Sequence, residues 1–142
     1  MKLTLKLIPL LFFPLLFAGC GGDVSRLKTH PVEGTVQFEG RPLEGAFVVL
    51  HPKGLSDPKN LPAHAKTDAM GKFKTSTYDA HDGAIAGEYS VTVEYTELVK
   101  TEDGVVSGPN LLPPRYASPS TTDVTIRIAE GDNQLPIINL SR

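Results

Sequence analysis

Most of the chain after residue 30 alternates between apolar and polar residues, and this alternation limits what it can fold into. The longest clean run is GEYSVTVEY, residues 87–95. Its large apolar side chains point to one side of an extended strand: Tyr89, Val91, Val93 and Tyr95. Because side chains in a strand alternate between the two faces, the run predicts a half-buried antiparallel strand, with one face on a core and the other in solvent.

Similar short runs recur along the chain, whereas helical periodicity does not. Alternation is present at 32–38, 64–67, 124–129 and 133–140, and residues 46–52 are apolar on both faces, as expected of a central strand. Pro136 in the last run predicts an edge strand or a bulge, because proline has no N–H for a central ladder. The sequence therefore predicts about seven short strands in an all-β, two-layer antiparallel sandwich.

Two segments between these runs carry turn-forming and strand-breaking residues. The sequence TDAMGKF, residues 67–73, predicts a tight turn in which Asp68 caps the turn and Gly71 supplies a positive φ. Residues 96–120 hold most of the other breakers: Gly104, Gly108, Pro109, Pro113, Pro114 and Pro119. A connection of this length without a pattern of its own predicts a functional or mobile loop.

The first nineteen residues follow a different pattern. Lys2 and Lys6 form a positive start, residues 7–17 are apolar with two prolines among them, and Ala18 and Gly19 are small. About 20 apolar residues are needed to span a bilayer. The pattern therefore predicts a signal peptide rather than a membrane span.

Cys20 directly follows this pattern and is the only cysteine of the chain. A single thiol cannot form an intramolecular disulfide, and no second thiol is available for a metal site. The sequence FAGC resembles the lipobox of bacterial lipoproteins, with Phe17 where those proteins usually carry leucine. The resemblance implies that Cys20 is lipidated and ties the protein to a membrane of the bacterial cell envelope, facing the periplasm or the exterior. The alternative is an ordinary secretory signal that is cut elsewhere.

The lipoprotein interpretation divides the chain into a signal peptide (1–19), a lipidated cysteine with its tether (20–29) and one domain (30–142). Loss of the signal removes Lys2 and Lys6 and leaves 123 of the 142 residues, with 12 Lys and Arg against 16 Asp and Glu, a net charge near −4. The chain has no tryptophan and no basic run. This composition argues against a nucleic-acid partner.

Four groups of residues follow a spacing that is more specific than the alternation expected of any β-sandwich. They are Gly34 and Val36; Gly40, Pro42, Leu43, Gly45 and Ala46; Thr67, Asp68, Gly71 and Phe73; and Gly87, Tyr89, Val91 and Val93. This spacing resembles the carboxypeptidase-regulatory-like domains, a branch of the prealbumin-like (transthyretin-like) sandwiches, and residues 111–140 are similar to small lipoproteins of planctomycete-like bacteria. The resemblance covers residues 30–140 and implies a seven-stranded antiparallel Greek-key sandwich. It implies little about activity, because the matching residues form turns and core.

The sequence carries no recognisable catalytic motif. Hydroxyisourate hydrolases share the prealbumin-like fold and end in Tyr-Arg-Gly-Ser, whereas this chain ends in IINLSR. His30 precedes the first strand as their N-terminal histidine does, but Arg41 and His51 match their other residues only by a forced alignment. We therefore predict a protein without catalytic residues.

Metal binding is likewise not predicted by the spacing of the ligand-type residues. The four histidines are too far apart in sequence to form a local ligand pair, although His51 and His64 could meet on a sheet face. The acidic segment that holds Asp79, Asp82 and Glu88 lacks the EF-hand spacing of a calcium loop. We therefore predict no metal and no cofactor.

These observations predict a non-catalytic binding or structural module at the cell envelope, with an envelope protein or a glycan as its partner besides the membrane. The candidate contacts lie in the 96–120 loop: Leu111, Leu112, Arg115 and Tyr116. The alternative is that the apolar side chains of this loop fold back and cap the sandwich. Two other classes of function stay open. One is a carbohydrate-binding module, for which the chain has no Trp and only 4 Tyr as stacking rings, and the other is a hydrolase of the hydroxyisourate type.

Overall fold

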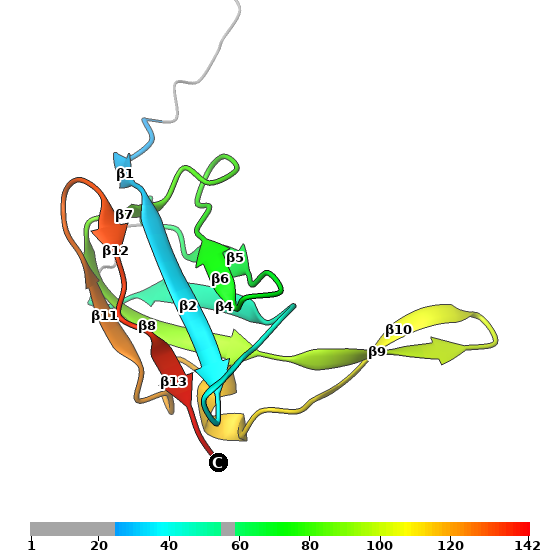
Figure 1. Ribbon diagram of the computed structural model, residues 1–142. Helices are drawn as coiled ribbons and strands as arrows, with labels where there is room; N and C mark the ends of the chain where they lie inside the picture. Colours follow the sequence, from blue (N-terminus) through cyan, green and yellow to red (C-terminus); the bar gives the residue numbers. More distant parts are fainter. Residues whose placement is uncertain (1–24, 55–58) are drawn as a thin grey trace, which may run out of the picture.

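The computed structural model describes residues 25–54 and 59–142 and shows two β-sheets packed face to face (Figure 1). The predicted signal peptide and Cys20 lie outside the described residues. Thirteen strand segments and one short 3-10 helix make up the described fold. The prediction of an all-β sandwich is confirmed, with more and shorter strands than the seven expected.

The first sheet has four antiparallel strands in the order β11 (Thr125–Ile128), β8 (Gly87–Glu94), β4 (Phe47–Pro52) and β5 (Ala63–Lys66). The strand predicted at residues 87–95 is β8, and it lies in the middle of this sheet. Its register with β4 places Val91 opposite Leu50 and Val93 opposite Val48. The inward faces of both strands therefore form a continuous apolar surface.

The second sheet is built around β2 (Val32–Phe38). On one side β2 pairs antiparallel with β3 (Arg41–Pro42) and β6 (Lys72–Lys74), and on the other it pairs parallel with β12 (Asn133–Gln134) and β13 (Ile138–Leu140). The prediction of an entirely antiparallel sandwich is wrong here. The connection after β11 crosses from the first sheet to the edge of the second instead of returning as a hairpin. For this reason β12 and β13 run parallel to β2.

The core lies between the two sheets and contains side chains from both. Its fully or almost fully buried members include Val32, Val36, Val48, Leu50, Tyr89, Val91, Val93 and Leu140. The Phe73 ring covers Gly34, where an added Cβ would lie 2.5 Å from the ring Cζ. Gly34 therefore leaves the space that this aromatic side chain fills.

Two local features of the sequence take the predicted form. In the 67–73 turn, the Asp68 carboxylate accepts hydrogen bonds from the N–H groups of Met70 (2.8 Å) and Lys72 (2.9 Å), and Gly71 has a φ of +72°. Pro136 lies between β12 and β13, two short segments at the edge of the second sheet. Both outcomes depend only on neighbouring residues: a side-chain cap and a glycine form the turn, and proline lacks the N–H that a central strand needs.

The segment 96–120 differs from the predicted irregular loop. Residues Thr96–Thr101 (β9) and Gly104–Asn110 (β10) pair as an antiparallel hairpin, and Pro114–Ala117 form the 3-10 helix η1. Figure 1 shows this hairpin extending away from the two sheets. The Gly-Pro pair at 108–109 does not end the strand because it falls where the register shifts between Ser107 and Asn110.

One further pair, β1 (Thr29–His30) with β7 (Ala84–Ile85), joins the start of the described chain to the end of the sandwich. Along residues 25–54 and 59–142 we find no helix of the length and apolarity that crossing a membrane requires.

Candidate functional site

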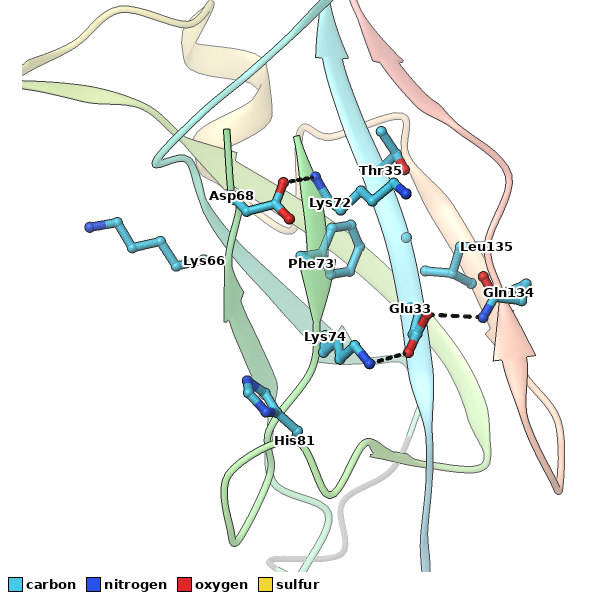
Figure 2. Close-up of a pocket in the computed structure, with 11 residues that line it drawn as sticks. Glu33, Thr35, Lys66, Asp68, Lys72, Phe73, Lys74, His81, Gln134 and Leu135 are labelled. Atoms are coloured by element: carbon cyan, nitrogen blue, oxygen red, sulfur yellow. Dashed lines mark hydrogen bonds and ion pairs between the residues drawn. The ribbon is translucent and has the colours of Figure 1, made fainter. Parts of the chain in front are cut away.

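A polar groove of about 360 Å³ lies beside β2 and β6 (Figure 2). Its lining includes Glu33, Thr35, Lys66, Asp68, Lys72, Phe73, Lys74, His81, Gln134 and Leu135. Glu33, Lys72 and Lys74 come from outward positions of β2 and β6, while Val32, Val36 and Phe73 of the same strands point into the core. The groove is therefore a product of strand alternation at the sandwich surface.

The acidic groups of this groove are already engaged. Glu33 forms an ion pair with Lys74 (Oε1 to Nζ, 2.6 Å) and accepts a hydrogen bond from Gln134 Nε2 (3.2 Å). The hydrogen bond from Lys74 lowers the pKa of Glu33, which keeps this carboxyl ionised and unsuited to act as a general acid. Asp68 holds the 67–73 turn, and Figure 2 shows the Lys66 and Lys72 side chains pointing in opposite directions. The groove thus presents neither an acid–base pair nor convergent cations.

The β9–β10 hairpin presents a different surface, because its apolar side chains are exposed. Leu98 is 73% exposed, Val105 58%, Val106 50% and Val99 43%. The register places Val106 directly opposite Val99, so these two side chains share one face of the ribbon. Lys100 lies opposite Val105, and Ser107 lies opposite Leu98 on the other face. Each face of the hairpin therefore carries two apolar side chains in solvent.

The hairpin also leaves its backbone edges open. Strands β9 and β10 pair only with each other among the described residues. A two-stranded hairpin without a sheet or helix against it is marginally stable in water, and open strand edges readily accept another strand. The acidic pair Glu102 and Asp103 forms the tip. This charge disfavours insertion of the tip into a lipid bilayer.

Asn110 fixes the base of the hairpin to the sandwich. Its Oδ1 accepts hydrogen bonds from the N–H groups of Tyr95 (3.0 Å) and Leu112 (3.2 Å), and Leu111 N–H donates to the Tyr95 carbonyl (2.8 Å). These bonds hold the two ends of the ribbon together where it leaves β8. The direction of the hairpin is therefore set by the sandwich.

The four predicted contact residues follow the hairpin and have unequal exposure. Leu112 and Tyr116 are 4% and 3% exposed and belong to the core, whereas Leu111 is 45% exposed. The Arg115 guanidinium lies 4.6 Å from the Tyr116 ring centroid, and its Nη2 donates to Tyr116 Oη (2.9 Å). The prediction of partner contacts is wrong for Leu112 and Tyr116, because the segment folds back and caps the sandwich as the alternative stated. Leu111 is the member that stays well exposed.

The histidines do not assemble into a catalytic or metal site. His30 is buried in β1, just before β2, and accepts a hydrogen bond from Gly131 N–H (2.9 Å), whereas Arg41 lies in β3, beside the opposite end of β2. His51 and His64 share the outer face of the first sheet, and His51 Nε2 is 2.9 Å from Thr92 Oγ1. In the part of the chain that the structure describes, no three His, Cys, Asp or Glu side chains are grouped as metal ligands would be.

The acidic segment at 79–88 uses its carboxylates for structure. Asp82 accepts hydrogen bonds from the N–H groups of Thr77 (2.7 Å), Tyr78 (3.0 Å) and Asp79 (3.2 Å). Asp79 in turn forms an ion pair with Arg26 at 2.6 Å. These carboxylates shape a loop and hold Arg26 near the start of the described residues, and the geometry does not favour a calcium site.

Comparisons with known proteins do not assign a family. No family model matches the chain, and no curated protein matches it. A 9R-lipoxygenase from Cyanothece is similar in structure at 15% identity and a TM-score of 0.45, with 80% of this chain covering only 16% of the lipoxygenase. A candidate carbohydrate-binding protein from Pseudomonas aeruginosa is similar at 13% identity and a TM-score of 0.42, covering 82% of this chain and 90% of that protein. Likeness at this level carries no argument about activity.

Proposed function

We propose that this chain is a non-catalytic binding module that Cys20 anchors by lipid to the bacterial cell envelope, and that the β9–β10 hairpin is its contact surface for a partner protein. The observation that carries the proposal is the exposure of Leu98, Val99, Val105 and Val106 on a ribbon whose strands, among the residues that the structure describes, pair only with each other. The assignment to the carboxypeptidase-regulatory-like domains is part of the same proposal and rests on the turn and strand spacing.

The surface chemistry favours a protein partner over a glycan. The hairpin carries valine and leucine but no aromatic ring, and the aromatic ring beside the groove, Phe73, is buried. Sugars are bound by stacking rings together with hydrogen-bonding side chains, and the hairpin supplies no stacking ring. A partner strand, by contrast, would complete the open backbone edge and cover the apolar side chains.

A photo-cross-linking experiment in intact cells tests the hairpin as the contact surface. A photoreactive residue at Val105 is expected to form an adduct with one protein, and the Leu98→Ser/Val99→Ser variant should lower its yield roughly tenfold. The matched control is Ile137→Ser, since Ile137 is also 58% exposed but lies on the sandwich. An adduct from a photoreactive residue at Met70 but not from Val105 would place the contact elsewhere.

The anchor is tested separately by the mass of the mature N-terminal peptide from membrane and soluble fractions. A diacylated or triacylated Cys20, and loss of membrane attachment in Cys20→Ser, are the expected results. An unmodified N-terminus cut at another residue, with the protein in the soluble fraction, would contradict the anchor.

A further inference from the structure

The first described residues of the chain are docked against one end of the sandwich. Arg26 Nη1 contacts Asp79 Oδ2 at 2.6 Å, and its guanidinium lies 5.2 Å from the Tyr78 ring centroid. The N–H of Leu27 donates to Tyr78 Oη (3.2 Å). This segment therefore follows a defined path over the 76–83 loop before β1 begins.

Further contacts hold the segment on both sides of Arg26. Lys59 Nζ donates to Ser25 Oγ (2.9 Å), and Tyr78 Oη donates to the Lys59 carbonyl (3.1 Å). At the other end, β1 pairs with β7, with His30 opposite Ala84. Each surface contact is weak by itself, but together they bind residues 25–30 at several points.

The position of this docked segment limits how far the sandwich can lie from Cys20. Five Cα–Cα steps separate Cys20 from Ser25, and a fully extended chain covers about 3.3–3.6 Å per residue, so the two residues are at most about 18 Å apart. The opposite end of β2, with Phe38, is roughly 20 Å further away, since a seven-residue strand has this length.

We infer that the sandwich has a fixed membrane-facing end, formed by the docked residues 25–30 and the 76–83 loop, and that the lipid surface holding Cys20 covers this end. This inference rests on the proposed lipid anchor. Figure 1 shows β1 at this end, the C-terminus at the opposite end, and the hairpin extending to the side. In this orientation the hairpin runs along the membrane surface, where a neighbouring envelope protein can meet it.

The chain has no tryptophan, so one introduced Trp is a unique fluorescent reporter. We would compare Ala80→Trp, in the exposed part of the 76–83 loop, with Arg41→Trp, at the far end of β2. The mature lipidated chain would be bound to phosphatidylcholine vesicles that contain dansyl-labelled phosphatidylethanolamine. Energy transfer to the dansyl group is expected to be about twofold or more greater for Ala80→Trp, given the length of β2. Equal transfer, or greater transfer for Arg41→Trp, would overturn the orientation.

The role of the docked segment is tested by removing its ion pair. In Arg26→Ala, release of residues 25–28 would lengthen the free tether to nine Cα–Cα steps, about 30 Å. The difference in energy transfer between the Ala80→Trp and Arg41→Trp reporters should therefore become smaller. Lys28→Ala is the matched control, since Lys28 is an exposed cation of the same segment. An unchanged difference in Arg26→Ala, or the same loss in Lys28→Ala, would show that this contact does not set the orientation.

A failure of the anchor can be separated from a failure of the orientation. If the mature N-terminus carries no lipid, the proposed anchor fails. The Cys20 thiol of the same chain would then be coupled to a maleimide lipid, and the two Trp variants compared again. A greater transfer for Ala80→Trp would support the docked end even then, and equal transfer would reject it.

Discussion

The first sheet and the β9–β10 hairpin are both built from antiparallel strands that carry apolar residues, and they differ in what those residues contact. In β8, Tyr89, Val91 and Val93 are buried against the second sheet. In the hairpin, Leu98 and Val105 lie in solvent, although their strands also form an antiparallel ladder. Alternation marks the strand with a buried face, β8, whereas β9 and β10 form without it; burial of an apolar side chain depends on whether a second layer lies against its strand.

Because of this difference, the apolar residues of the sandwich stabilise the fold, whereas those of the hairpin are available for binding. Burying one leucine or valine side chain stabilises a fold by about 1.5–3 kcal/mol. The sandwich has this contribution in its folded state, and the four exposed hairpin side chains do not. Their apolar surface remains available to stabilise a complex, which is why we place the partner contact there.

The largest expected effect is on the free energy of unfolding, when a leucine is replaced by alanine in the core and, for comparison, in the hairpin. Leu50→Ala should lower the free energy of unfolding by about 2–5 kcal/mol, because Leu50 is completely buried. Leu98→Ala should change it by less than about 0.5 kcal/mol. Urea denaturation of the mature chain measures both. A loss for Leu98→Ala close to that of Leu50→Ala would mean that the hairpin packs within its own chain.

The second effect concerns the close packing of the core at Gly34. Gly34→Ala should destabilise the fold by about 1–3 kcal/mol, because the new methyl group would overlap the Phe73 ring. A double-mutant cycle with Phe73→Leu checks this cause, since a smaller side chain should relieve part of the clash. Additive losses would show that the two residues do not interact in this way.

A smaller and more local effect is expected at the base of the hairpin. Asn110→Ala removes the acceptor for two backbone N–H groups and should cost about 1–2 kcal/mol locally. Amide hydrogen exchange should then become faster in β9 and β10 and stay unchanged in β8. Asn139→Ala, at an exposed position of β13, is the control and should leave exchange in the hairpin unaltered. Equal effects of the two substitutions would argue against Asn110 as the attachment point.

The smallest expected effect is a change in the pH dependence of stability. It concerns His51, which lies half-buried on the outer face of the first sheet. Burial lowers the pKa of His51, so the unfolded chain takes up a proton more readily than the folded chain as the pH falls below 6.5. The free energy of unfolding should therefore decrease between pH 7 and pH 5. His51→Gln should show a shallower decrease, measured by urea denaturation at each pH. Identical slopes for the two proteins would contradict a role of His51 burial.

Part of the hairpin could have been found from the sequence. Asp103 and Gly104 lie between Leu98-Val99 and Val105-Val106, and Asp-Gly between apolar pairs is a known hairpin signal. The prolines further along the segment favoured an irregular loop instead. They are compatible with the observed fold because Pro109 lies at the register shift of β10 and Pro113 and Pro114 begin η1.

The sequence by itself determined the strands and the local turns, because these depend on neighbouring residues. Alternation identified β8, and Asp68 with Gly71 determined the 67–73 turn through hydrogen bonds within five residues. The tertiary structure decided which apolar residues are buried. Leu112 and Tyr116 enter the core while Leu98 stays exposed, and β13 pairs parallel with β2. These outcomes depend on contacts between segments far apart in the chain, which hydropathy and local spacing do not encode.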